Sequence, residues 1–399
     1  MDPPKPEDAR VTLVTSRNLV RASDAVPAHH RIADVRHGRG LTALPEDVWG
    51  GSDEDESADE DSADKSPERV RARKRRRRRC DAGRNEIVQA LITASGLLNR
   101  VKVVEPQPAS LEAARALHED AYLQVLGAFE EASREELMAY NLVDDAAPFP
   151  HVLQHALWIA GASLCAAAEL AAGSADIAVN LCGGRHHAGS SRASGFCFVN
   201  DIVLAAQELQ RRFGRVMIVD IDVHHGDGTE RAFLHSNKVL TISFHQREPG
   251  FFPGTGDSSC RGKGKGEGYN VNVPFTHESD RAAFLFAFEK VFRDSFAFFS
   301  PGAVVFVCGV DALKADPRGG LSLEAEDIVA CTRIIRELCV DGPTRVPLLV
   351  TGAGGYDFAA AAKTWTRVVA ELANAQSSLP EDVPEHEFFE MYGPSWRLR

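Results

Sequence analysis

Eight short apolar runs rich in β-branched residues alternate with longer amphipathic segments along most of this 399-residue chain. Such alternation predicts β-α-β units, in which helices cover a parallel sheet. Because the runs are almost continuously hydrophobic, both faces of the sheet should be buried. The predicted strands span residues 11–15, 101–104, 176–181, 215–221, 239–245, 269–273, 303–309 and 346–352. The sequence therefore predicts an α/β fold with an eight-stranded parallel sheet.

The segments between these runs carry the longer periodicity of helices that pack one face against a sheet. No internal repeat is present. The predicted helices span residues 110–126, 153–172, 201–213, 279–298, 323–340 and 358–374.

One region departs from this pattern and consists of two charged blocks. Residues 51–64 contain eight acidic and no basic residues, whereas residues 69–79 contain nine basic and no acidic residues. Neither block can contribute to a hydrophobic core, so we expect a disordered, solvated insertion over residues 25–83. Runs of Lys and Arg are the type of segment that nuclear import receptors read. The alternative is that the basic block only balances the charge of its acidic neighbour.

Composition limits the functional classes. The chain has 44% hydrophobic residues, no apolar signal region at its start and no apolar run long enough to span a bilayer, which predicts an intracellular soluble protein. Its eight cysteines form no C-x-x-C pair, so we expect reduced thiols rather than a disulfide framework or a thiolate metal site. The net charge of -12 favours basic partners.

Polar, chemically versatile residues follow four of the predicted strands. Ligands bind at the carboxyl ends of the strands in open parallel sheets, so these four ends should meet on one rim. The segments are "NLCGGRHHAGSSRASGFCFVND" (180–201), "DIDVHHGDG" (220–228), "CGVDALKADP" (308–317) and "GAGGYD" (352–357).

Three of these residues have the character of metal ligands. Asp222 and His224 are two apart at a strand end and so reach the same side, and Asp311 can join them from the seventh strand. Two carboxylates and one imidazole suit Zn²⁺ or Fe²⁺ and leave a coordination position open for water. Such residues singly are more often turn or capping residues, but the whole constellation favours a catalytic metal.

The remaining polar residues fit acid–base chemistry around such an ion. Asp220 and Asp227 are carboxylates of the kind that orient catalytic imidazoles, and the paired His186 and His187 are the imidazoles. One histidine could take a proton from water and return it to a leaving amine. Tyr356, on a glycine turn, could donate a hydrogen bond to an oxyanion.

These segments, together with "FFPGTGD", "GKGEGYNVNVPF" and "HEFFEMYGP", resemble the signature segments of zinc-dependent histone deacetylases, and most closely the class I branch. The resemblance covers residues 84–394 in order, and also the first predicted strand. It implies the arginase–deacetylase fold, a single domain formed by residues 1–24 and 84–399, with the charged insertion outside it. It also implies a metal-dependent protein lysine deacetylase.

By the same resemblance, Asp222, His224 and Asp311 are the zinc ligands. Asp220 then supports His186, and Asp227 supports His187, the general base and acid, while Tyr356 polarises the acetyl carbonyl. The resemblance assigns the residues around the substrate as follows: Phe196 and Phe252 wall the acyl-lysine tube, Gly195 leaves room in it, Asp145 binds the substrate backbone, and Arg84 lines the cavity for acetate.

The resemblance also implies two potassium sites. The first would use Asp220, Ser243 and the backbone carbonyls of Asp222, His224 and Phe244. The second would lie near Phe233, Ser236, Val239 and Tyr269.

Three positions depart from the family pattern. Arg185 stands where relatives usually have Leu or Trp, Arg318 where class I members have an apolar rim residue, and Ala146 where a Cys usually follows the substrate-binding Asp. The catalytic set is intact, whereas pocket shape and acyl preference are left open.

Other activities of the same fold would require different residues. An arginase-like dinuclear hydrolase would need an acid two residues after Asp311, where Leu313 stands. An acetylpolyamine deacetylase would need an acid at the rim, where Arg318 has the wrong sign. A weakly active corepressor scaffold that only binds acetyl-lysine would be expected to lack a metal ligand or Tyr356.

The resemblance and the basic run together suggest the partners. We expect acetylated histone tails or other acetyl-lysine proteins as substrates, a corepressor complex, and an import receptor that binds residues 69–79. Nuclear localisation follows from that run, with the cytoplasm as an additional compartment.

Overall fold

The computed structural model describes residues 9–25 and 83–399 and contains a single eight-stranded sheet among them. All neighbouring strands run parallel, in the order β2-β1-β3-β8-β7-β4-β5-β6. The predicted α/β class and parallel sheet are confirmed. The strands are β1 (Val11–Val14), β2 (Lys102–Val104), β3 (Ile177–Asn180), β4 (Val216–Asp220), β5 (Val239–Gln246), β6 (Asn270–Phe275), β7 (Ala303–Val307) and β8 (Leu348–Thr351).

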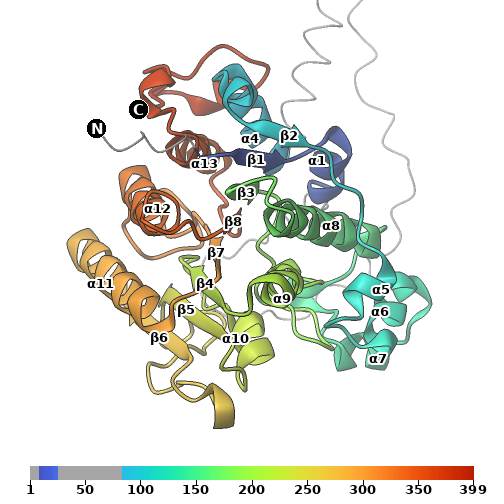
Figure 1. Ribbon diagram of the computed structural model, residues 1–399. Helices are drawn as coiled ribbons and strands as arrows, with labels where there is room; N and C mark the ends of the chain where they lie inside the picture. Colours follow the sequence, from blue (N-terminus) through green and yellow to red (C-terminus); the bar gives the residue numbers. More distant parts are fainter. Residues whose placement is uncertain (1–8, 26–82) are drawn as a thin grey trace, which may run out of the picture.

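Helices cover both faces of this sheet (Figure 1). One face packs against α4 (Arg84–Ala94), α11 (Arg281–Phe299), α12 (Ala325–Cys339) and α13 (Phe358–Leu372). The other face packs against α1 (Arg17–Ser23), α8 (Val152–Ala171), α9 (Asp201–Phe213) and α10 (Asp227–Phe233). The short helices α5 (Leu111–Ala114), α6 (Asp120–Gly127) and α7 (Arg134–Ala139) lie beside α8 and α9, where α5 and α6 share a third cluster of buried residues with α8.

Strand β4 shows why the apolar runs are continuous rather than alternating. Successive side chains of a strand point to opposite faces. Met217 and Val219 accordingly join the cluster under α11, α12 and α13, whereas Val216 and Ile218 join the cluster under α8 and α9. Both faces of the strand are buried, so neither tolerates a polar residue until the chain leaves the sheet at Asp220.

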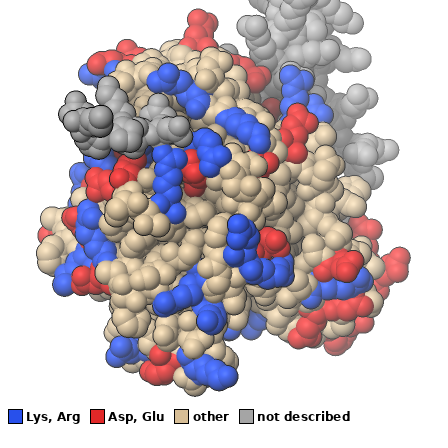
Figure 2. All heavy atoms as spheres, viewed as in Figure 1, with Lys and Arg blue, Asp and Glu red and all other residues tan. Residues whose placement is uncertain are grey.

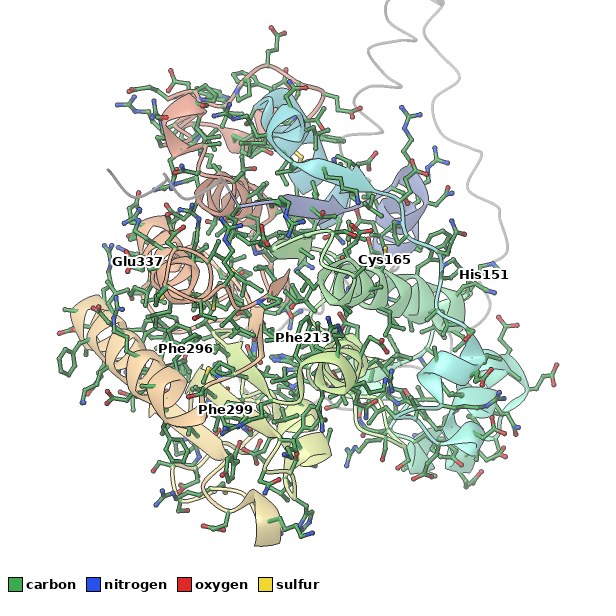
Figure 3. All side chains as sticks on the ribbon, viewed as in Figure 1. His151, Cys165, Phe213, Phe296, Phe299 and Glu337 are labelled. Carbon is green, nitrogen blue, oxygen red and sulfur yellow. The ribbon has the colours of Figure 1, made fainter. Side chains whose placement is uncertain are left out.

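Phenylalanine forms much of the packing of α11. Phe284, Phe288, Phe292 and Phe299 are buried, and the rings of Phe292 and Phe296 lie 5.8 Å apart. Phe296 and Phe299 are labelled near the carboxyl end of this helix in Figure 3. The ring of Phe284 also contacts Phe244 of β5 and Phe275 of β6, so α11 covers the outer strands of the sheet.

The prediction of one continuous helix over residues 110–126 is wrong. Residues 110–126 form two helices, α5 and α6, rather than one. Between them the backbone N–H of Glu119 donates to the carbonyl of Ser190, and the buried side chain of His118 accepts a hydrogen bond from the backbone N–H of Asn200. The N–H of Glu119 is therefore not available for a helical hydrogen bond to the carbonyl of Arg115, and the helix is interrupted there.

The charged insertion expected over residues 25–83 lies, apart from its end residues, outside the described part of the chain, and so does the basic run 69–79. Among the described residues, no helix has the length and apolar character needed to cross a membrane. On the face drawn in Figure 2, basic and acidic side chains of the described residues are interspersed rather than separated.

Candidate active site

The four polar strand ends belong to four adjacent strands. In the sheet order, β3, β8, β7 and β4 are neighbours at the centre of the sheet, and all run in the same direction. Their carboxyl ends therefore open onto one rim, as predicted (Figure 1). The loops after these ends carry His186 and His187, Tyr356, Asp311, and Asp222 with His224.

Asp222, His224 and Asp311 form a compact cluster at this rim. One ligand atom from each lies within 4.8 Å of the others, and this is the metal-ligand group found among the described residues. Nδ1 of His224 is 3.2 Å from Oδ1 of Asp222 and 3.0 Å from Oδ2 of Asp311. Backbone N–H groups orient the carboxylates, because Gly354 donates to Asp222 and Val223 donates to Asp311.

The electrostatics of this cluster favour a bound cation. Burial and the nearby Asp222 carboxylate raise the pKa of Asp311 to about 7. Burial would lower the pKa of His224, but its hydrogen bonds to the two carboxylates outweigh this and raise it to about 10. Two buried carboxylates so close together require a positive charge between them. The donor set of two carboxylates and one imidazole fits a single Zn²⁺ or Fe²⁺ ion.

Beside this cluster lie two histidine–aspartate pairs. Nδ1 of His186 is 2.7 Å from Oδ2 of Asp220, and Nδ1 of His187 is 2.8 Å from Oδ1 of Asp227. The two imidazole rings are 3.9 Å apart, and all four side chains are buried. Each aspartate therefore fixes the Nδ1–H tautomer of its histidine and leaves Nε2 as a proton acceptor.

The two histidines differ in basicity. Burial, helped by the positive charge of His186, lowers the pKa of His187 to about 3. Burial also opposes the protonation of His186, but Asp220 and Asp222 outweigh it and raise that pKa to about 9. His187 is thus the neutral imidazole of the pair, which is the state that a general base requires.

A tight hairpin turn shapes the entrance to the site. Ser194 and Cys197 pair across Gly195 and Phe196, whose φ angles of 52° and 63° are both positive. Two positive φ angles are typical of the type I′ turn. A Cβ atom at Gly195 would lie 2.5 Å from Cδ2 of His187 and 3.0 Å from Cε1 of Phe252. Only glycine therefore leaves the passage between this turn and Phe252 open.

Asp145 stabilises the same turn through hydrogen bonds. It lies in the short 3₁₀ helix Asp144–Ala146, and its Oδ2 accepts a hydrogen bond of 2.8 Å from the backbone N–H of Gly195. Its backbone carbonyl accepts from Phe196. The Asp145 residue is only partly buried, so its carboxylate can also face a ligand at the entrance. Ala146, the departure from the family pattern, is buried behind it.

Tyr356 lines the same cavity. Its ring is 6.2 Å from that of Phe196, and the guanidinium carbon of Arg318 is 4.8 Å from the Tyr356 ring centre and 5.0 Å from that of Phe196. Burial and the two metal-cluster carboxylates raise the pKa of the Tyr356 hydroxyl well above its usual value. The phenol therefore remains protonated and can donate a hydrogen bond.

Arg84 and Arg185 line the inner part of the same cavity, which has a volume of about 110 Å³. Nη1 of Arg84 donates to the backbone carbonyls of Ala353 and Gly355, and its guanidinium stacks 4.8 Å from the ring centre of Trp365. The backbone N–H of Arg185 is held by the buried carboxylate of Asp201. The cavity therefore continues inward past the histidine pair.

The residues expected to bind potassium fall into two groups. Asp220 and Ser243 are register partners on β4 and β5, next to Asp222, His224 and Phe244. In the second group, the Ser236 hydroxyl accepts hydrogen bonds from the backbone N–H groups of Lys238 and Val239. The backbone N–H of Ser236 donates to the carbonyl of Phe233. Tyr269 joins this group through its carbonyl, which accepts from Thr241 on β5.

Sequence reasoning missed two carboxylates that position the site. The buried Asp316 accepts hydrogen bonds from the backbone N–H groups of Tyr356, Asp357 and Arg318. Asp201 accepts from the N–H groups of Gly184 and Arg185 and from the hydroxyl of Ser163. Both residues stand inside the quoted segments "CGVDALKADP" and "FVND", so the signal was present, but their partners lie far away in sequence.

The chain is similar to known proteins over most of its length. The histone deacetylase domain family matches residues 78–372. Histone deacetylase 8 of Xenopus tropicalis is 39% identical over 318 residues, which is 79% of this chain and 84% of that protein. Histone deacetylase RPD3 of Saccharomyces cerevisiae is 37% identical over 79% of this chain and 72% of its own length, and human histone deacetylase 1 is 34% identical over 79% and 64%.

Proposed function

Because the chain belongs to the histone deacetylase family and is therefore a lysine deacetylase, we propose that it hydrolyses acetyl-lysine in proteins with one divalent metal ion. Asp222, His224 and Asp311 would hold this ion, Zn²⁺ or Fe²⁺. When bound, it would polarise the acetyl carbonyl and lower the pKa of a bound water. The observation that supports this most strongly is the convergence of these three residues beside two histidine–aspartate pairs.

His187 acts as the general base and acid. Its Nε2 takes a proton from the attacking water while Asp227 holds Nδ1–H, and it later gives the proton to the lysine nitrogen as the carbon–nitrogen bond breaks. Asp220 holds His186 in the same tautomer beside it. Tyr356 donates its hydroxyl proton in a hydrogen bond to the oxyanion that forms on the acetyl oxygen.

The substrate enters past Phe196 and Phe252, which enclose its apolar methylene stem. Gly195 keeps the passage wide enough, and the carboxylate of Asp145 accepts hydrogen bonds from the backbone of the substrate. Arg318 and Arg185 shape the mouth and the inner cavity, and Arg84 binds the released acetate. Potassium ions would bind at the two groups of residues around Ser243 and around Ser236.

The catalytic domain would consist of residues 1–24 and 84–399, with residues 25–83 as an insertion. Acetylated histone tails or other acetyl-lysine proteins are the proposed substrates, within a corepressor complex in the nucleus. An import receptor would bind residues 69–79, whose nine basic residues motivate this part of the proposal. Deletion of 69–79 should leave catalysis intact and shift a fluorescently tagged protein out of the nucleus; unchanged nuclear imaging would contradict it.

Metal analysis combined with an acetyl-lysine peptide assay tests the central proposal. The purified protein should carry about one divalent ion per chain. Asp222→Ala should lose both the ion and activity, whereas Asp294→Ala, which removes an exposed acid on α11, should retain both. Full metal occupancy in Asp222→Ala, or no turnover by the metal-loaded wild type, would overturn the proposal.

A further inference from the structure

The inner end of the active-site cavity contains two arginines. Arg84 and Arg185 both line it, together with Ser23, Asp24 and Phe358. Asp24 is the acid at this end, and its oxygens accept hydrogen bonds from the backbone N–H groups of Asn85 and Glu86 at the start of α4. The charge of this acid is thus already engaged by a helix amino terminus.

The guanidinium of Arg185 has few hydrogen-bond acceptors among the described residues. Its Nε atom is buried and has no hydrogen-bond partner among the described residues. Nη2 makes one long contact of 3.5 Å, to the carbonyl of Cys182. Leaving a buried charged donor unpaired is costly, so a ligand that accepts from it would be stabilised.

The positive charges of Arg84 and Arg185 also act on each other. Burial and then the charge of Arg185 lower the pKa of Arg84. Arg84 is held by the carbonyls of Ala353 and Gly355 and by Trp365, so it cannot move away from its neighbour without losing these contacts. An anion at this point would relieve the repulsion.

An acyl group of the substrate would point toward this pair. The lysine stem enters at Phe196 and the carbonyl carbon is attacked beside His187, so the rest of the acyl chain extends toward the inner end. The lining of the cavity continues past His187 to Arg84, Arg185 and Asp24, and its whole volume of about 110 Å³ is several times the roughly 10–15 Å³ that one water needs on the same measure. There is room for a chain longer than acetyl.

Building on the proposed function, we propose that this enzyme also removes acyl groups that end in a carboxylate, such as succinyl, from lysine. Arg185, with Arg84 beside it, binds the terminal carboxylate at the inner end of the cavity. The oxygen of water bonds to the acyl carbon, the bond to the lysine nitrogen breaks, and His187 returns the proton to that nitrogen. The products are a dicarboxylate and the unmodified lysine side chain of the protein.

The test uses one peptide that carries acetyl-, succinyl- or succinamoyl-lysine. Succinamoyl is the neutral amide of the same shape as succinyl, so their ratio of kcat/KM isolates the charge. The metal-loaded wild type should prefer succinyl by about tenfold or more, the size expected of a charge-assisted hydrogen bond. The ratio should fall to about 1 in Arg185→Gln. The matched control Arg211→Gln removes an exposed arginine from α9 and should keep the wild-type ratio.

Calorimetric binding of succinate and of its monoamide separates this inference from the proposed function. Wild type should bind succinate more tightly, and Arg185→Gln should lose this preference, whether or not any peptide is hydrolysed. Absence of acetyl-peptide turnover with preserved succinate binding would refute only the proposed function. A wild type that turns over the acetyl peptide but shows no preference for succinyl, or an unchanged ratio in Arg185→Gln, would overturn the dicarboxylate inference.

Discussion

The Asp316 carboxylate accepts a hydrogen bond from the backbone N–H of Tyr356, with 2.6 Å between Oδ2 and N. Its other oxygen accepts from the backbone N–H of Arg318. One buried side chain therefore positions both the residue proposed to polarise the acyl carbonyl and the arginine that stacks on its ring. The position of Tyr356 in the cavity wall therefore depends on Asp316, a residue that does not itself contact the substrate.

Asp316→Ala should lower kcat about tenfold, because buried N–H groups left without an acceptor cost about 1–3 kcal/mol and the turn that carries Tyr356 will shift. KM should change less. Asp316→Asn keeps one oxygen acceptor and should recover part of the loss. Steady-state kinetics on an acetyl-lysine peptide provides the measurement, and equal kcat values for wild type and Asp316→Ala would contradict the positioning role.

Tyr356→Phe removes the hydroxyl proposed to stabilise the oxyanion. Loss of one such donor costs about 10²–10³ in kcat. Because the ring still packs against Phe196 and Arg318, KM should change little. A rise in KM with kcat preserved would instead assign the tyrosine to substrate binding.

Gly195→Ala should close the entrance. The added Cβ would lie 2.5 Å from Cδ2 of His187, and the φ of 52° is unfavourable for alanine. We expect activity to fall by at least about tenfold, with a modest loss of stability of about 1 kcal/mol. Gly173→Ala has a similar φ of 69° but open space around it, so this variant should share the loss of stability and keep full activity. Equal activities of the two variants would argue against the steric explanation.

Arg318→Glu tests whether the charge at this position makes the enzyme prefer acetylated peptides to acetylated polyamines. The guanidinium over the rings of Phe196 and Tyr356 should repel the remote ammonium of an acetylated spermidine. Wild type should therefore prefer an acetyl-lysine peptide, and the charge reversal should move the kcat/KM ratio toward the polyamine by about tenfold. Arg318→Gln, which loses only the charge, should fall between. A wild type that already prefers the polyamine would refute the electrostatic argument.

His118 should make folding stability depend on pH. Burial lowers its pKa to about 4 in the folded protein, where its Nε2 must stay unprotonated to accept from the N–H of Asn200. The unfolded chain, with a pKa of about 6.5, takes up the proton first on acidification, so stability is lost as the pH falls from about 6.5 to about 4. The whole loss over this range should be about 3 kcal/mol.

His118→Gln keeps an oxygen that can accept from Asn200 but cannot take up a proton. Urea unfolding at pH 7 and pH 5 should therefore show a smaller loss for this variant than for the wild type. Parallel pH profiles of the two proteins would contradict the assignment. His155, whose pKa burial and then Arg185 lower to about 3, should contribute a slope of the same sign in both proteins.

All eight strands could be located from the sequence because a strand buried on both faces requires a continuous apolar run, and such runs are local. The rim was also predictable, since parallel strands bring their carboxyl ends to one edge. The break between α5 and α6 was not, because it depends on Ser190 and Asn200, which lie far along the chain. Helical periodicity contains no record of such distant acceptors and donors.

The sequence by itself determined the α/β class, the order of its elements and the residue types of the candidate site, because periodicity, strand-end chemistry and family resemblance are all properties of short segments. The tertiary structure alone decided which groups meet. It brings Asp316 within hydrogen-bond distance of Tyr356, Asp201 within hydrogen-bond distance of Arg185, and Arg185 into the same cavity as Arg84. Several of these residues are far apart in the sequence, and loops and packing bring them together. Hydrogen bonds and charge repulsion act over a few ångströms, so their strength depends on positions that only the packed sheet and helices fix.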